Sequence, residues 1–84
     1  MRINDDDTFD YHGNTYLLVD HAQEGATLVR ACVCRTKRVK KELWSDGYPV
    51  ENLGGYAREA DFNYDTALVL ACQNAADLLD GRKE

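Results

Sequence analysis

The sequence has few of the features that mark membrane, secreted or disulfide-bonded proteins. No stretch approaches the roughly 20 apolar residues that a transmembrane helix needs. The first seven residues lack the apolar core of a secretory signal. Three cysteines are an odd number, which does not suit a secreted fold held by disulfides. We therefore expect a cytoplasmic protein with reduced thiols and no membrane partner.

Motifs for catalysis, phosphate binding and metal binding are also missing. Gly54-Gly55 lacks the surrounding residues of a phosphate-binding loop. The residues that can supply sulfur and nitrogen ligands are Cys32, Cys34, Cys72, His12 and His21. One residue separates Cys32 from Cys34, which is too few for a zinc knuckle, and no local motif joins a nucleophile to a histidine and an acid. We predict no enzyme, no cofactor and no metal, and rank a zinc or thiol enzyme as the least favoured alternative.

The size and composition indicate one small globular domain. The chain has 84 residues, of which 44% are hydrophobic and 30% are charged, as in folded soluble proteins. A chain this short can bury only one core. We expect a single domain over residues 1–84, in which 1–7 form a flexible acidic lead-in, 8–50 are rich in strands and 56–80 are helical.

The strongest local pattern predicts a helix over residues 64–80. Leu68, Cys72, Ala75 and Leu79 recur at the spacing of one helical face. The residues that can cap or charge its start are Asp61, Asn63 and Asp65. Gly81 suits the left-handed position after a helix. The spacing also allows one longer helix that begins at Tyr56.

The first half of the sequence predicts an antiparallel sheet. Thr8–Tyr11 and residues 15–20 read as two strands, joined by turn residues at 12–14. Residues 27–34 read as a third strand. Its alternating residues Val29, Ala31 and Val33 are apolar, so we expect this face to meet the helix.

The middle of the chain is harder to assign. If the third strand ran straight on, Arg35, Lys37 and Lys41 would point to the same buried face as the apolar residues before them. Burial of three unpaired cations is too costly. We therefore predict a turn or bulge at 35–38 and a fourth strand at 39–44. A hairpin at Asp46-Gly47 and an edge segment with Pro49 follow. A helix over residues 35–44 is the alternative. Residues 52–55 are expected to be flexible and to end the sheet.

Together these segments predict an α+β fold. About four antiparallel strands form a small sheet, and the C-terminal amphipathic helix packs on one face of it. The exposed edge strand and the surplus of aromatic residues also suggest a homodimer.

Charge is distributed unevenly along the chain. The net charge is −5, yet six of the ten basic residues lie between Arg30 and Lys41, a stretch without an acid. We call five of them the basic strip: Arg35, Lys37, Arg38, Lys40 and Lys41. With Trp44 nearby, this strip can contact phosphates and stack bases, so a nucleic-acid-binding module is the alternative function. Against it, the acidic remainder of the chain would repel a phosphate backbone.

The leading functional hypothesis rests on the acidic remainder and the aromatic residues. The chain has more aromatics than one small core needs, and exposed aromatics are typical interface anchors. We expect a small acidic protein-binding module that acts as an inhibitor or accessory subunit on a basic surface of a larger partner. A phage-type inhibitor of a nucleic-acid-targeting defence complex is one such protein. The expected contact residues are Asp5, Asp6, Asp7, Asp10, Tyr11, Tyr16, Trp44 and Tyr48.

Overall fold

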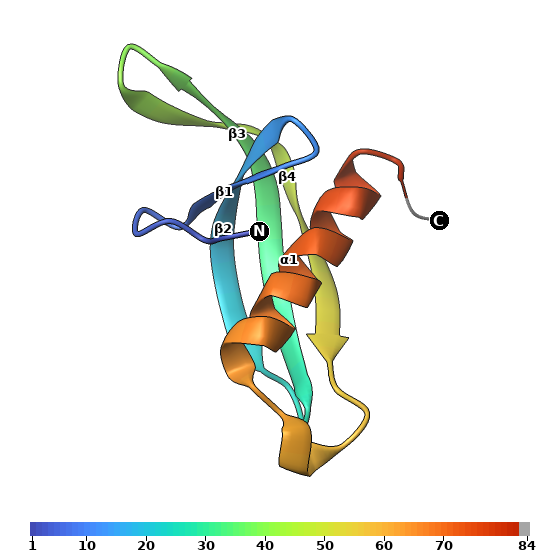
Figure 1. The fold of residues 1–84 in the computed structure, drawn as a ribbon. Coiled ribbons are helices and arrows are strands. Elements are labelled where there is room, and N and C mark those ends of the chain that lie inside the picture. Colours follow the sequence, from blue (N-terminus) through green and yellow to red (C-terminus); the bar gives the residue numbers. More distant parts are fainter. Residues whose placement is uncertain (83–84) are drawn as a thin grey trace.

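The computed structural model describes residues 1–82 and shows the predicted α+β fold. Its strands are β1 (Thr8–Tyr11), β2 (Asn14–Gln23), β3 (Leu28–Val39) and β4 (Glu42–Gly55), followed by a 3₁₀ turn η1 (Glu59–Asp61) and the helix α1 (Tyr64–Leu79). The strands form one antiparallel sheet in the order β1-β2-β3-β4. Helix α1 lies across one face of this sheet (Figure 1).

The ends of α1 follow the sequence signals. The Asn63 side chain accepts a hydrogen bond from the Thr66 backbone N–H, which satisfies one of the free donors at the helix start. Gly81 takes the left-handed conformation beyond the last turn, with φ of 72°. The helix begins at Tyr64, so the longer helix from Tyr56 does not form.

The core lies between α1 and the inner face of the sheet, as the spacing predicts. Val29, Ala31 and Val33 of β3 are completely buried, and so are Cys72 and Ala75 of the helix. Small residues let the helix approach the sheet closely. At Gly54 of β4, an added Cβ would lie 2.5 Å from the Ala67 carbonyl oxygen, so the helix backbone leaves no room for a side chain.

The β3–β4 connection differs from its predicted position. The hairpin turn is Lys40-Lys41, and the Asp46-Gly47 hairpin is wrong. Gly47, Tyr48 and Pro49 instead form a bulge in β4, because three residues there face only Cys34 of β3. Proline is tolerated in a bulge on an edge strand, where its missing N–H breaks no central ladder.

The two other predictions for this region also need correction. Residues 35–39 and 42–44 lie in strands and the turn Lys40-Lys41 joins them, so the helical alternative is wrong. Residues 52–55 do not end the sheet as a flexible segment, because they are the last part of β4 and pair with Leu28–Ala31 in β3. The sheet therefore continues to Gly55.

The long β3–β4 hairpin extends past the part of the sheet that α1 covers. We call its outer part the arm, residues 36–48; Figure 1 shows it projecting away from the helix. The projection makes the molecule elongated, with extents of 44 × 29 × 19 Å. The projection also explains how the strand can continue without burying its cations. Lys37 points to the same face as Val33, but it lies beyond the core and is exposed to solvent.

Hydrogen bonds connect the lead-in, residues 1–7, to the sheet. The Leu18 N–H donates to the Asp7 carbonyl at 2.8 Å, and the Asn4 N–H donates to the Thr8 carbonyl at 2.8 Å. The Asp6 carboxylate accepts from the Thr8 backbone N–H at 3.1 Å and from its hydroxyl at 2.5 Å. These bonds hold the acidic run beside β1 and β2.

Candidate binding surface

The structure separates the predicted contact residues into buried and exposed groups. Tyr16 is completely buried in the core, and its ring stacks on Phe9 with centroids 5.2 Å apart. A fully buried ring cannot anchor a partner, so this part of the prediction is wrong. Tyr11 is half-buried, and its hydroxyl donates to Asp77 of the helix at 3.3 Å. Both tyrosines therefore contribute to the stability of the fold.

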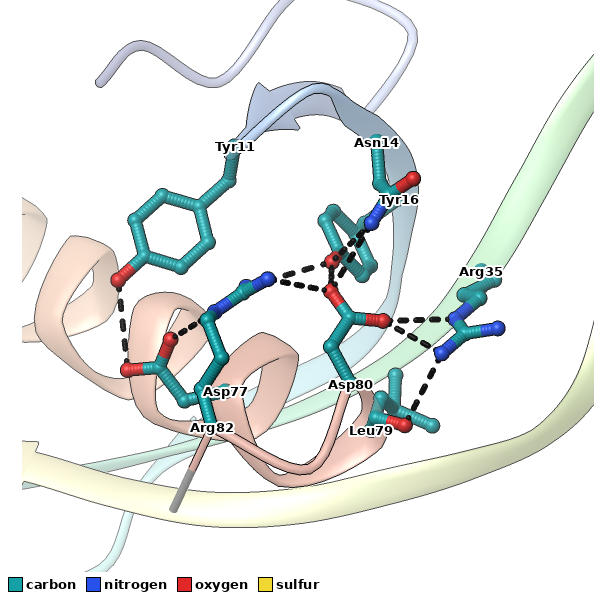
Figure 2. A network of polar contacts seen from close by, with 8 residues as sticks. All are labelled: Tyr11, Asn14, Tyr16, Arg35, Asp77, Leu79, Asp80 and Arg82. Atoms are coloured by element: carbon teal, nitrogen blue, oxygen red, sulfur yellow. Dashed lines mark hydrogen bonds and ion pairs between the residues drawn. The ribbon is translucent and has the colours of Figure 1, made fainter.

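A polar network, drawn in Figure 2, surrounds Asp80 at the end of α1. The Asp80 side chain is only 7% exposed. It accepts hydrogen bonds from the Tyr16 hydroxyl and from the Asn14 amide at 3.1 Å. Its ion pairs are with Arg35 at 2.6 Å and Arg82 at 2.9 Å. Arg35 also donates to the Leu79 carbonyl at 3.1 Å, so this member of the basic strip is held by the helix end.

A second carboxylate completes this network. Arg82 donates through Nε to Asp77 at 2.8 Å, and its guanidinium lies over the Tyr11 ring, 5.0 Å from the centroid. Burial raises the pKa of Tyr11, and the hydrogen bond to Asp77 raises it further. The polar groups of this network form hydrogen bonds and ion pairs with one another. We therefore interpret the network as a structural lock, that is, a set of contacts that stabilises the packing of the helix end on the sheet.

The acidic run lies next to the basic strip instead of forming a separate patch. Asp6 forms an ion pair with Arg38 of the arm. Hydrogen bonds from the Thr8 hydroxyl, and then from Arg38, hold the pKa of Asp6 below its usual value. Asp10 accepts a bond from the Thr15 hydroxyl at 2.8 Å. Much of the other acidic charge is also engaged: six further acids form ion pairs, namely Asp20, Glu24, Glu51, Asp61, Asp77 and Asp80.

Three of those acids gather around one arginine on the face of the sheet away from the helix. Arg30 pairs with Glu24 at 2.9 Å, Asp20 at 3.1 Å and Glu51 at 3.5 Å. Hydrogen bonds from Arg30 to Glu24, and then to Asp20, raise its pKa. Arg30 thus links β2, β3 and β4, and its charge is neutralised within the chain.

The remaining basic charge is concentrated in the arm. Lys37, Lys40 and Lys41 are exposed, and within residues 1–82 they form no ion pair. Five arginines, by contrast, are all paired: Arg30, Arg35, Arg38, Arg58 and Arg82. The free part of the predicted basic strip is therefore its three lysines.

The arm also carries the most exposed aromatic residues. Trp44 is 53% exposed and Tyr48 is 90% exposed. Trp44 pairs with Lys37 across the hairpin, so the two side chains share one face of the arm. Val39 continues that face toward the tip and is also exposed. Aromatic, aliphatic and cationic groups thus lie together on an edge hairpin, and the sequence prediction did not include Val39.

The cysteines and histidines show no arrangement for catalysis or metal binding. Cys72 of α1 faces the core between helix and sheet, whereas the strand alternation of β3 turns Cys32 and Cys34 to the other face of the sheet. Burial raises the pKa of Cys72 to about 12 and also raises that of Cys32, which opposes thiolate formation. Among the described residues, no group of three or more His, Cys, Asp or Glu can hold a metal ion.

A groove lies between the lead-in and the start of α1. Its volume is about 490 Å³, and Ile3, Leu18 and Leu68 contribute apolar walls. On its rim, His21 Nδ1 lies 2.6 Å from the Tyr64 hydroxyl. The groove is open, and its polar groups do not form an arrangement of nucleophile, base and orienting acid.

Comparisons with known proteins do not identify the chain: no protein family, curated protein or solved structure matches it. Over the part of the chain that the structure describes, no helix is long and apolar enough to cross a membrane.

Proposed function

We propose that this chain is a small, non-catalytic protein-binding module that acts as an inhibitor or accessory subunit of a larger partner. We further propose that the arm makes the contact. The exposure of Trp44 and Tyr48 on the projecting β4 edge carries this proposal. Aromatic side chains are enriched among the residues that dominate binding energy at protein interfaces.

The geometry of the arm supports a binding role. A two-stranded hairpin that projects from the core gains little stability from packing, so its length is not explained by the fold. An exposed apolar face on such a hairpin costs solubility, and contiguous exposed apolar residues commonly mark interaction sites. β4 is also an edge strand, whose free backbone groups can pair with a partner.

The contact surface in this proposal differs from the one expected from sequence. The acidic run was expected to meet a basic partner, but Asp6 is already paired with Arg38. Asp5, Asp7 and Asp10 lie outside the ion pairs formed within residues 1–82. They can steer a basic surface, but they lack the exposed aromatics that the arm provides.

Capture of a partner from lysate, with matched variants, tests this function. The immobilised wild-type protein should retain a protein from nuclease-treated lysate. The Trp44→Ala/Tyr48→Ala variant should lose it, while the control Val19→Ala/Leu53→Ala, which removes exposed apolar groups outside the arm, should keep it. Retention of the same protein by all three would contradict the role of the arm.

Nucleic-acid binding is the second candidate. Its support is that Lys37, Lys40 and Lys41 lie on the same hairpin as Trp44, since phosphate contacts and base stacking need these two residue types together. A captured signal that disappears after nuclease treatment would favour this candidate.

A further inference from the structure

The turn at the tip of the arm has an unusual sequence for its conformation. Lys40 has φ of 53° and Lys41 has φ of 71°, so both lie in the left-handed region. This pattern is that of a type I′ hairpin turn, for which Asn-Gly is strongly preferred. A side chain with a Cβ is strained there, and lysine has no short polar group to compensate locally. The turn would be more stable with other residues.

The lysines at the tip therefore call for a reason other than turn stability. Backbone strain of this kind clusters at functional sites, where it is kept for what the side chains do. Neither Lys40 nor Lys41 has an ion-pair partner within residues 1–82. The turn thus places two adjacent free charges at the tip of the arm, the hairpin that projects away from the helix in Figure 1.

The charges around the arm distinguish between two kinds of anionic partner. A nucleic-acid strand would run on past the tip, and its phosphates would meet Glu42 and Asp46 of the arm or the acidic run at its base. Arg38, the arginine of the arm, is already paired with Asp6. The free cations form a short cluster instead of a track, which fits a local acidic site on a protein better than an extended polyanion.

We propose that Lys40 and Lys41 insert the tip of the arm into an acidic surface of the protein partner. Trp44 and Lys37 then pack against the rim of that surface. This inference rests on the proposed function and adds the chemistry of the partner. The turn places the two exposed lysines next to each other at the end of the hairpin, where an acidic surface can contact both.

One double variant separates charge from folding. Lys40→Asn/Lys41→Gly supplies the preferred turn residues while it removes both charges, so the arm should stay folded. The matched control Arg2→Gln/Arg58→Gln removes the same charge from exposed positions outside the arm. Trp44 is the only tryptophan, so its fluorescence reports binding at the arm directly.

The probes are a poly-glutamate peptide and a poly-deoxythymidine oligonucleotide of matched charge. Poly-glutamate should change the Trp44 fluorescence of the wild type with saturation, and salt should weaken the binding. The Lys40→Asn/Lys41→Gly variant should bind poly-glutamate about tenfold more weakly, whereas the Arg2→Gln/Arg58→Gln control should match the wild type. Equal affinity of the lysine variant and wild type, no response to poly-glutamate, or tighter binding of the oligonucleotide would each overturn the inference.

The capture experiment distinguishes failure of this inference from failure of the proposed function. If the lysine variant still retains the partner while Trp44→Ala/Tyr48→Ala loses it, the acidic-site inference fails and the protein-binding function stands. If both variants retain the partner, the arm is not the contact and both proposals fail. Loss of the partner by both variants, with retention by the arginine control, supports both.

Discussion

Arg35 of β3 and Asp80 beyond α1 form an ion pair that closes the helix end onto the sheet. Their nearest nitrogen and oxygen atoms are 2.6 Å apart, although 45 residues separate them in the chain. Acids near a helix C-terminus oppose the helix dipole. Here the arginine compensates, and Tyr16 and Asn14 satisfy the other carboxylate oxygen (Figure 2).

Removal of this carboxylate should destabilise the protein. Asp80→Ala leaves the buried Tyr16 hydroxyl without its acceptor and Arg35 without its ion pair, which should lower the free energy of unfolding by about 2 kcal/mol. Urea denaturation followed by circular dichroism measures the change. The control Glu59→Ala, at an exposed position, should stay within about 0.5 kcal/mol. A similar small effect at Asp80 would show that the network is not a structural lock.

Gly54 should not tolerate a side chain. In Gly54→Ala the new Cβ would lie 2.5 Å from the Ala67 carbonyl oxygen and 2.6 Å from the Ala71 nitrogen, both of which are helix backbone. The helix would have to move away from β4, at a cost of about 2–3 kcal/mol. Gly25→Ala is the control, because its Cβ would make only ordinary contacts at 3.9 Å. Equal thermal midpoints for the two variants would contradict the close packing of α1 on β4.

The sequence predicted the helix well because its signals are local. The apolar spacing, the cap at Asn63 and the glycine at position 81 all lie within or next to the helix, and each acts through short-range chemistry. The buried face of β3 could be predicted equally well, since Val29, Ala31 and Val33 alternate with Arg30 and Cys32. The fold class followed from these two elements.

The arm was missed because its turn violates the local rules. Asp46-Gly47 has the stronger hairpin signal, but the pairing of β3 with β4 overrides it and converts it into a bulge. A continuous strand would bury three cations only if its alternating face stayed in the core to the end. Arg35 does lie on that face, where Asp80 neutralises it, and the residues beyond it leave the core. Both facts depend on contacts distant in sequence.

The turn at the arm tip should become more stable when its lysines are replaced. Lys40→Asn/Lys41→Gly relieves two strained left-handed residues, and we expect a gain of about 1 kcal/mol. Backbone amides of the arm should then exchange with solvent about fivefold more slowly. Hydrogen exchange by NMR gives this rate residue by residue. Unchanged or faster exchange in the arm would show that the turn is not strained.

Cys72 should make stability fall at alkaline pH. Burial raises the pKa of its thiol to about 12 in the folded chain, above the value of about 8.5 for an unfolded chain. Between these values only the unfolded state loses the proton, so its free energy decreases relative to the folded state. The free energy of unfolding should fall by about 1.4 kcal/mol per pH unit from this thiol above about pH 9. The contribution is fully present below that pH.

The Cys72→Ala variant isolates this contribution. Its unfolding free energy should depend less steeply on pH than that of the wild type between about pH 9 and pH 11, because the thiol is absent. Urea denaturation at several pH values compares the two slopes. Parallel slopes would contradict burial of a protonated thiol between the helix and the sheet.

Photo-crosslinking from the arm tests the proposed binding function most directly. A p-benzoylphenylalanine residue in place of Tyr48 should crosslink one protein from nuclease-treated lysate, because this position is 90% exposed on the arm. The same residue in place of Val19, which is exposed on β2, should give no such product. A product from position 19 alone, or no product from position 48, would contradict the account that the arm is the contact surface.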